Sequence, residues 1–219
     1  MTTNSAKPPT RKGAATRARL VAAAKSVFER KGFLNARVSD ITTRAKISYG
    51  TFYHYFDSKE AIFLELAQLE EARLTSPLPD AGGGARRRGT TALERITEAN
   101  RRYLERYREQ AAIMGVIEQV SRYDEQVNAV RVATQHHFAE RAERSCRRLQ
   151  RDGVADAGLD PVVAGDALGA MVGRFAELWL VQGYRDYDFD EAVEQLSLLW
   201  ANALRIPTGG GPSQTEVNQ

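Results

Sequence analysis

The sequence predicts an all-α protein in which a small three-helix N-terminal domain precedes a larger C-terminal helical domain. Apolar residues recur at intervals of three and four along every long segment, as on one face of a helix, and no segment shows the alternation typical of a strand. Prolines and glycines interrupt this pattern at Ser76 to Thr90, where we expect a loop. The expected domains are 14–60 and 61–206, between a disordered basic arm at 1–13 and a disordered tail at 207–219.

The first domain is predicted to begin with an amphipathic helix over residues 16–31, which Gly32 ends. Its apolar face consists of Leu20, Val21, Ala24, Val27 and Phe28. A second, short helix is indicated by three apolar residues at the same spacing, namely Val38, Ile41 and Ala45. It is expected to end near Ala45.

A third short helix is expected at Gly50 to Phe56, after a break in the pattern. Phe52 and Phe56 are four residues apart, so both are expected to face the core. Asp57 and Ser58 favour the start of a fourth helix. The buried stripe of that helix is expected to contain Ile62, Phe63, Leu66 and Leu69.

The second domain is predicted to be helical throughout. The expected helices run over Leu93–Glu109, Ala111–Tyr123, Glu125–Asp152, Asp160–Gln182 and Asp190–Arg205. The last two have broad apolar faces, and small residues such as Gly165, Gly169 and Gly173 would allow close helix packing. We expect these two helices to form a subunit interface, although an ordinary intrachain core would explain the same faces.

Positive charge is concentrated near the N-terminus. Of the 31 basic and 28 acidic residues in the chain, the first 60 positions hold 12 and 4, a net charge of +8. The remaining 19 basic and 24 acidic residues give −5. This asymmetry is typical of a nucleic-acid-binding domain attached to a neutral or acidic body.

The sequence gives little support for other functional classes. It contains no catalytic or phosphate-binding motif that we can identify, so we expect no enzyme and no cofactor. The single cysteine, Cys146, cannot form an internal disulfide, and no Cys/His spacing suggests a zinc site. No apolar run is long enough for a membrane helix, and no signal peptide is evident, so a cytoplasmic protein is expected.

Lys46 to Lys59, KISYGTFYHYFDSK, has the features of a recognition helix for DNA. Gly50 would allow close approach of the backbone, and Thr51 and Tyr53 would reach base edges. His54, Tyr55 and Lys59 would donate hydrogen bonds or charge to phosphates. Phe52, Tyr55 and Phe56 could instead be core residues with no contact to DNA. We prefer this alternative for Phe52 and Phe56.

Gly32-Phe33 and the following VSDITTRAKISYGTFYHYFDSKEAIF resemble the helix-turn-helix of the TetR family of transcriptional regulators. The similarity extends from about Thr16 to Leu66. It implies an N-terminal helix-turn-helix DNA-binding domain and a larger helical ligand-binding and dimerisation domain. The residues at positions that commonly contact DNA in the family are Ser48, Tyr49, Gly50, Thr51, Tyr53, His54, Tyr55 and Lys59.

Two residues depart from the family pattern. Arg37 stands where a threonine commonly caps the second helix. We therefore expect the side-chain cap to be lost and a guanidinium that can bind phosphate to be gained. Lys46 replaces the usual glycine of the turn, and a left-handed backbone at this lysine would cost about 1 kcal/mol.

The resemblance also implies a homodimer formed through the last two helices, a palindromic DNA operator and a small hydrophobic effector. The candidate effector-binding residues are Tyr103, Tyr107, Met114, Ile117, His137, Phe138, Met171 and Phe175. His136 and His137 are about 100° apart on a helix, so they cannot chelate one metal together. We expect a repressor that the effector releases from DNA. A ligand-dependent activator and a DNA-binding protein without an effector remain alternatives.

Overall fold

The computed structural model describes residues 10–76 and 90–207, which form two compact units. The first contains the described residues up to Ala72 together with Ala112–Arg131. The second contains the remaining described residues of Arg73–Ala111 and those from Val132 onward. Residues 77–89 of the expected loop, most of the expected N-terminal arm and nearly all of the expected tail lie outside the described residues. All the regular elements in the described part are helices.

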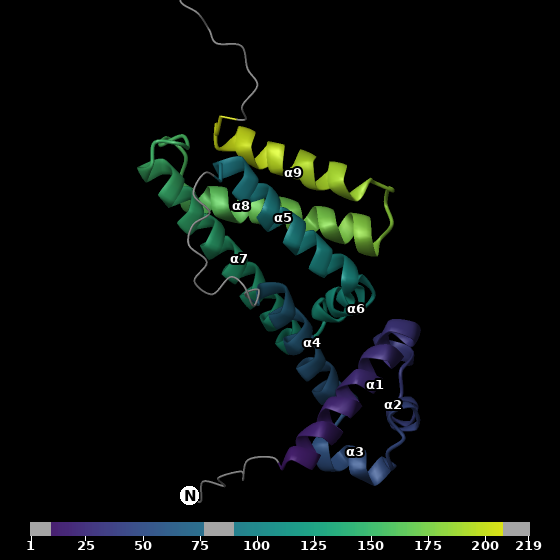
Figure 1. Cartoon of the computed structure of the whole chain (residues 1–219). Coiled ribbons are helices and arrows are strands. Elements are labelled where there is room, and N and C mark those ends of the chain that lie inside the picture. Colours follow the sequence, from purple (N-terminus) through teal and green to yellow (C-terminus); the bar gives the residue numbers. More distant parts are fainter. Residues whose placement is uncertain (1–9, 77–89, 208–219) are drawn as a thin grey trace, which may run out of the picture. The chain divides into compact units, whose positions relative to one another are not determined.

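The first unit contains the N-terminal helices and a second segment from the middle of the chain. Its helices are α1 (Arg11–Asn35), α2 (Val38–Ala45), α3 (Tyr49–Tyr55), most of α4 (Lys59–Thr75), nearly all of α6 (Ala111–Ser121) and the start of α7 (Glu125–Arg151). Figure 1 shows α2 beside α1 and α3, consistent with the contacts that α2 makes with both. The unit therefore extends beyond the expected boundary at residue 60 and includes α6.

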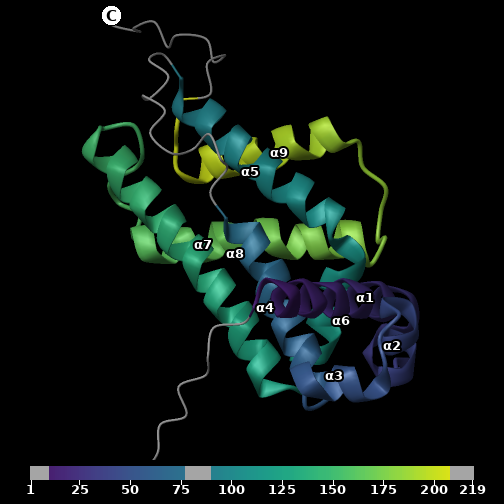
Figure 2. The same cartoon turned by 60° about the horizontal axis from the view of Figure 1, so that its bottom comes forward.

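The second unit contains α5 (Ala92–Glu109), the rest of α7, α8 (Pro161–Ala176) and α9 (Phe189–Ala203). A π-helical turn, Glu177–Val181, continues α8. Helix α5 packs mainly on α9 (Figure 2). Inside this contact, the buried Asn100 amide donates a hydrogen bond to Ser197 Oγ at 3.1 Å. Within the described residues, none of the helices has the length and apolarity required to cross a membrane.

The ends of α1 have local causes. Thr10 Oγ1 accepts a hydrogen bond from the Gly13 backbone N–H at 3.2 Å, so α1 begins at Arg11 rather than near Thr16. The sequence does not predict this start because no apolar residue larger than alanine precedes Leu20 in the helix. Gly32 has a φ of 69°, and this left-handed residue interrupts the helix where the sequence predicts a stop.

The core of the first unit surrounds three phenylalanines. The ring of Phe28 packs on those of Phe33 and Phe63, with centroid distances of 5.7 and 5.0 Å. Phe52 and Phe56 of the α3 region are also buried, as expected. The rings of Phe52 and Phe56 are 5.9 Å apart, so a pair of buried aromatic residues anchors the inner face of the short helix α3.

The expected buried stripe of α4 is wrong at one position. Ile62, Phe63 and Leu66 are buried, but Leu69 is 45% exposed and Glu70 is buried instead. Lys25 Nζ of α1 lies 3.2 Å from Glu70 Oε2, so an ion pair occupies the place where the sequence pattern predicts a leucine. An apolar pattern cannot identify a carboxylate that is buried with its counter-ion.

Candidate nucleic-acid interface

Helix α3 begins at a side-chain cap. Ser48 Oγ accepts a hydrogen bond from the Thr51 backbone N–H at 3.1 Å, and the hydroxyls of Ser48 and Thr51 are 2.7 Å apart. Both residues are expected to contact DNA, and in this structure both also stabilise the start of the helix.

The other end of α3 is held by Arg17 of α1. Its guanidinium forms an ion pair with Glu65 of α4 and donates a hydrogen bond to the Tyr55 carbonyl at 3.1 Å. The guanidinium carbon also lies 4.3 Å from the centre of the Phe56 ring. One side chain thus connects α1 and α4 to the end of α3, which fixes the orientation of the short helix.

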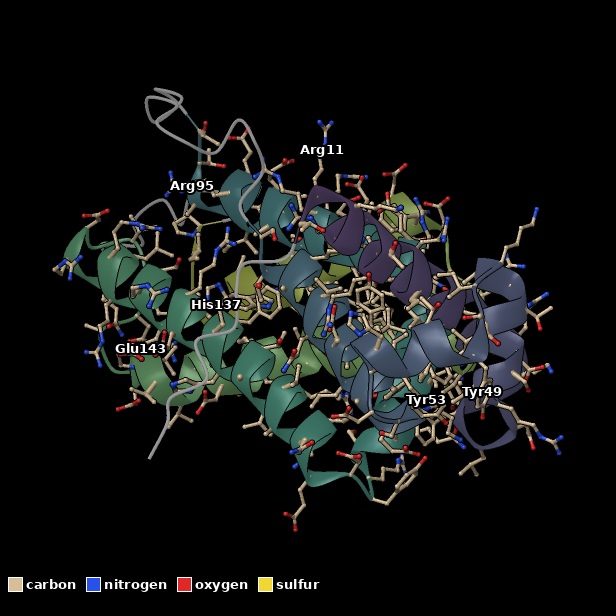
Figure 3. All side chains as sticks on the ribbon, turned by 90° about the horizontal axis from the view of Figure 1, so that it is seen from below. Arg11, Tyr49, Tyr53, Arg95, His137 and Glu143 are labelled. Atoms are coloured by element: carbon tan, nitrogen blue, oxygen red, sulfur yellow. The ribbon has the colours of Figure 1, made fainter. Side chains whose placement is uncertain are left out.

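The outer face of α3 presents two tyrosines. Tyr49 and Tyr53 are 54% and 45% exposed, and their rings meet edge to face at 5.2 Å (Figure 3). The Tyr53 hydroxyl donates a hydrogen bond to the Tyr49 hydroxyl at 3.4 Å, which raises the pKa of Tyr53. Large exposed aromatic residues on a firmly held helix form a surface suited to a partner.

The remaining expected residues of α3 lie around this pair. His54 is exposed, and its ring meets that of the half-buried Tyr55 at 5.1 Å. Gly50 is exposed, and no atom lies within 4 Å of the place where a Cβ would stand. The packing of the chain itself therefore does not require a glycine at position 50.

Lys59 makes an internal contact. Its Nζ donates a hydrogen bond to the Phe33 carbonyl at 2.9 Å and lies 4.3 Å from the centre of the Phe33 ring. This ammonium therefore joins the first turn of α4 to the residue that follows Gly32. The expected phosphate contact of Lys59 stays a prediction, to which the structure adds a stabilising role.

The start of α2 has no side-chain cap from Arg37. Instead, Asp40 accepts a hydrogen bond from the Arg37 backbone N–H at 3.0 Å, and the exposed Arg37 side chain makes no capping bond. Lys31 Nζ lies 2.7 Å from Asp40 Oδ1. The hydrogen bond from Lys31, followed by that from Arg37, lowers the pKa of Asp40.

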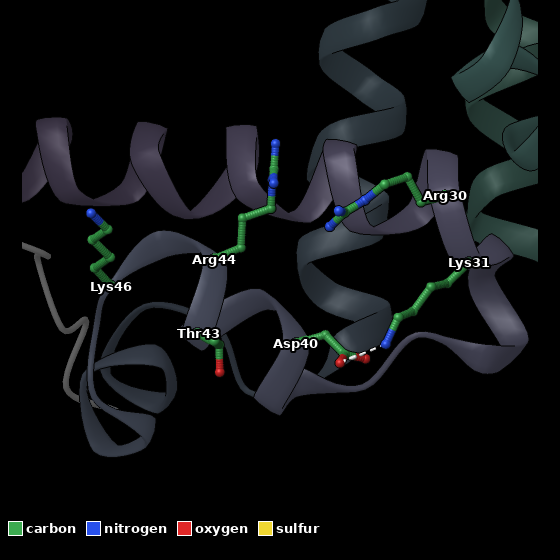
Figure 4. A pocket seen from close by; sticks show the side chains of 6 residues that line it. All are labelled: Arg30, Lys31, Asp40, Thr43, Arg44 and Lys46. Atoms are coloured by element: carbon green, nitrogen blue, oxygen red, sulfur yellow. Dashed lines mark hydrogen bonds and ion pairs between the residues drawn. The ribbon is translucent and has the colours of Figure 1, made fainter.

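The turn between α2 and α3 contains a left-handed lysine. Lys46 has a φ of 52°, the conformation in which the sequence predicts a cost for a residue other than glycine. Together with Arg30, Lys31, Asp40, Thr43 and Arg44, it lines an open groove between α1 and α2 (Figure 4). Sequence reasoning missed this group, although Arg30 and Lys31 just before Gly32 and Arg44 in the last turn of α2 were a signal for it.

The candidate effector-binding residues fall into separate groups. In the second unit, the Tyr103 ring lies 5.8 Å from that of Tyr107 and 5.2 Å from that of Phe138. Phe175 packs instead on Trp179 and Tyr187.

Of the other four candidates, His137 meets the Phe138 ring at a centroid distance of 6.0 Å. Met171 packs against the core that contains Leu168. Met114 and Ile117 are buried in the first unit, and His137 is exposed. The structure therefore brings Tyr103, Tyr107 and Phe138 together, and the effector-binding role of all eight residues stays a prediction.

Comparison with known proteins identifies the N-terminal part. The family model for bacterial regulatory proteins of the tetR family matches residues 20–66. The HTH-type transcriptional regulator YdgC of Bacillus subtilis, which is uncharacterized, is 49% identical over 55 residues, or 25% of this chain and 28% of the relative. UidR of Escherichia coli K12 is 38% identical over 58 residues, or 26% of this chain and 30% of the relative. The chain thus spans less than a third of the length of these curated relatives.

Solved structures share the fold over most of the chain. The fatty acid degradation regulator FadR of Bacillus halodurans has a TM-score of 0.70 at 18% identity and covers 88% of this chain and 97% of its own. FadR of Bacillus subtilis, in complex with stearoyl-CoA, has a TM-score of 0.67 at 17% identity. The match covers 84% of this chain and 96% of that FadR chain. At these identities the likeness concerns the fold alone. Residues 20–66 thus match the tetR family of bacterial regulatory proteins, and the curated relatives that are similar to this region are HTH-type transcriptional regulators.

Proposed function

We propose that the chain is a sequence-specific DNA-binding transcriptional regulator in which α3 enters the major groove. The observation that carries this proposal is the exposed pair Tyr49 and Tyr53 on a helix held by Ser48 at one end and Arg17 at the other. A short helix with a fixed orientation can place side chains against base edges in the groove. The net charge of +8 in the first 60 residues supplies the attraction to phosphate.

The roles within α3 follow from exposure and chemistry. Tyr53 and Thr51 are proposed to reach base edges, and Gly50 leaves room for the DNA backbone. His54, Tyr55, Lys59 and Arg37 are proposed to hold phosphates, which positions the domain without reading sequence. A regulator of this kind acts where the DNA is, so the cytoplasm is its proposed location.

We further propose that two copies associate through α8 and α9. The apolar faces of these helices divide into two parts. Val193 and Leu196 are buried within the chain, whereas Val163 and Leu199 are 66% and 53% exposed. An intrachain core therefore accounts for only part of the apolar surface. An exposed apolar face on two helices is suited to a symmetric contact with a second copy.

A small hydrophobic effector is the third part of the proposal. Tyr103, Tyr107 and Phe138 form an aromatic group in the second unit, and one structure of the same fold binds stearoyl-CoA. Effector binding is proposed to favour an arrangement in which the two α3 helices no longer match the major grooves of a palindromic operator, so that repression ends. Activation by the effector is the second possibility.

Selection from a pool of random-sequence duplexes with the full chain tests DNA recognition. We expect enrichment of a two-fold symmetric sequence with half-sites about 34 Å apart, or a multiple of that spacing. Tyr53→Ala should lose the preference for that sequence, whereas Tyr123→Ala, which removes another exposed tyrosine, should keep it. Failure to enrich any sequence, or equal behaviour of the two variants, would contradict the proposal.

Effector control is tested by adding small molecules to the complex with the selected duplex. Stearoyl-CoA is the first probe, followed by a panel of hydrophobic metabolites. We expect at least one to release the DNA, with weaker release from Phe138→Ala. A probe that strengthens DNA binding would indicate activation, and no response across the panel would favour a regulator without a small effector.

A further inference from the structure

The α1–α2 groove is an open basic hollow of about 550 Å³ on the first unit (Figure 4). The exposed tyrosines of α3 are not among the residues that line it. Its lining comes from the end of α1, from α2 and from the turn that leads to α3, and consists of Arg30, Lys31, Asp40, Thr43, Arg44 and Lys46.

The charges in this groove do not cancel. Asp40 is the one acidic residue of the lining. Its carboxylate forms an ion pair with Lys31 at 2.7 Å and accepts a hydrogen bond from the Arg37 backbone N–H at 3.0 Å. Among the residues that the structure describes, no carboxylate forms an ion pair with Arg30, Arg44 or Lys46. The groove therefore keeps an excess of three positive charges, with the exposed Thr43 beside them. This chemistry fits a phosphate group, which takes both charge and hydrogen bonds from such side chains.

Lys46 is a second indication that the groove has a function. Its left-handed backbone, with a φ of 52°, is unfavourable for a residue with a Cβ. Such conformations persist mainly where the surrounding structure enforces them, and they are frequent at binding sites. A glycine would relieve the strain but would remove a positive charge from the groove.

The position of Lys46 indicates the source of the phosphate. Lys46 lies two residues before Ser48, which caps the N-terminal end of α3. A recognition helix in the major groove has a sugar-phosphate strand near each end, because the two strands border the groove. We propose that the α1–α2 groove binds backbone phosphates of the DNA strand that borders the N-terminal end of α3. This inference rests on the proposed function.

The test is the salt dependence of DNA binding by Arg30→Gln/Arg44→Gln. Each phosphate contact makes the slope of log affinity against log salt steeper by about 0.9. Loss of two contacts should therefore flatten the slope by about two and weaken binding by about tenfold at physiological salt. The factor should be the same for the selected duplex and for a scrambled one, because phosphates carry no sequence information.

Two further variants complete the experiment. Arg30→Lys/Arg44→Lys keeps the charge and should restore most of the slope. Arg141→Gln/Arg151→Gln removes the same charge from exposed positions of α7 and should change the slope much less. Both glutamine variants replace exposed side chains, and thermal unfolding checks that they remain folded.

The outcomes separate the groove from the proposed function. A wild type that binds no duplex would contradict DNA binding itself. A wild type that binds DNA with a slope unchanged in Arg30→Gln/Arg44→Gln would overturn the groove assignment alone. An unchanged slope, combined with inorganic phosphate that raises the Tm of the wild type but not of this variant, would assign the groove to a free anion and would also overturn the DNA assignment.

Discussion

Lys59 Nζ donates a hydrogen bond to the Phe33 carbonyl and lies over the Phe33 ring, so one ammonium joins the start of α4 to the kink at the end of α1. This contact gives Lys59 a structural role beside its proposed role at phosphate.

Lys59→Met should affect both stability and DNA binding. It keeps most of the apolar stem but removes the donor and the charge. We expect a loss of about 1 kcal/mol of unfolding free energy in urea. The salt slope of DNA binding should flatten by about one. Lys59→Arg is the control for charge. A loss of stability with an unchanged slope would leave Lys59 with only its structural role.

Lys25→Met should destabilise the first unit, because Glu70 is 1% exposed and its Oε2 lies 3.2 Å from Lys25 Nζ. Removal of one partner from a buried ion pair commonly costs about 3 kcal/mol. Chemical denaturation measures this effect, and Lys25→Met/Glu70→Leu should recover much of it. Lys31→Met, at an exposed ion pair, should cost less than about 1 kcal/mol. Equal losses in the two single variants would contradict the importance of burial.

Gly165→Ala should disturb the contact between α7 and α8. A Cβ at this position would lie 2.9 Å from both the Ala139 carbonyl oxygen and the Glu143 backbone nitrogen. Because backbone atoms cannot give way as a flexible side chain can, we expect a loss of about 1 to 3 kcal/mol by denaturation. Gly169→Ala lies on the same helix with no atom within 4 Å of its Cβ, so it should be neutral or slightly stabilising. The reverse order would contradict the close approach.

Leu199→Glu should weaken the proposed association of two copies. The side chain is 53% exposed on α9, and a symmetric interface would bury it twice. We expect the dissociation constant to rise at least about tenfold by analytical ultracentrifugation. Val132→Glu changes a similarly exposed residue of α7 and should leave association unchanged. A dimer that tolerates Leu199→Glu would place the interface elsewhere.

Asp40 predicts a pH dependence of stability. Hydrogen bonds from Lys31 and the Arg37 backbone lower its pKa below the ordinary value of 3.8. The stabilisation is therefore present above pH 3.8 and is lost as the pH falls through the folded-state pKa. Urea denaturation across the acid range should show that the unfolding free energy falls less for Asp40→Asn than for the wild type as the pH decreases. An equal dependence of unfolding free energy on pH in both proteins would exclude this contribution of Asp40.

The sequence predicts the helical elements well because their causes are local. The expected end of α2 at Ala45 matches the structure, and the expected stop at Gly32 corresponds to an interruption of α1, which continues to Asn35. The apolar faces also place Phe52 and Phe56 correctly in the core.

The features that the sequence does not reveal depend on contacts between distant residues. The burial of Glu70 requires Lys25, which lies on another helix. The aromatic group joins Tyr103 of α5 to Phe138 of α7. The α1–α2 groove likewise depends on how two helix ends pack, which no periodic pattern contains.

The left-handed Lys46 also matters for protein engineering. A search for stabilised variants would favour Lys46→Gly, which relieves about 1 kcal/mol of backbone strain. If the groove acts on DNA, the same variant binds DNA less tightly. Selection for thermal resistance and selection for promoter occupancy would then drive this single position toward different residues.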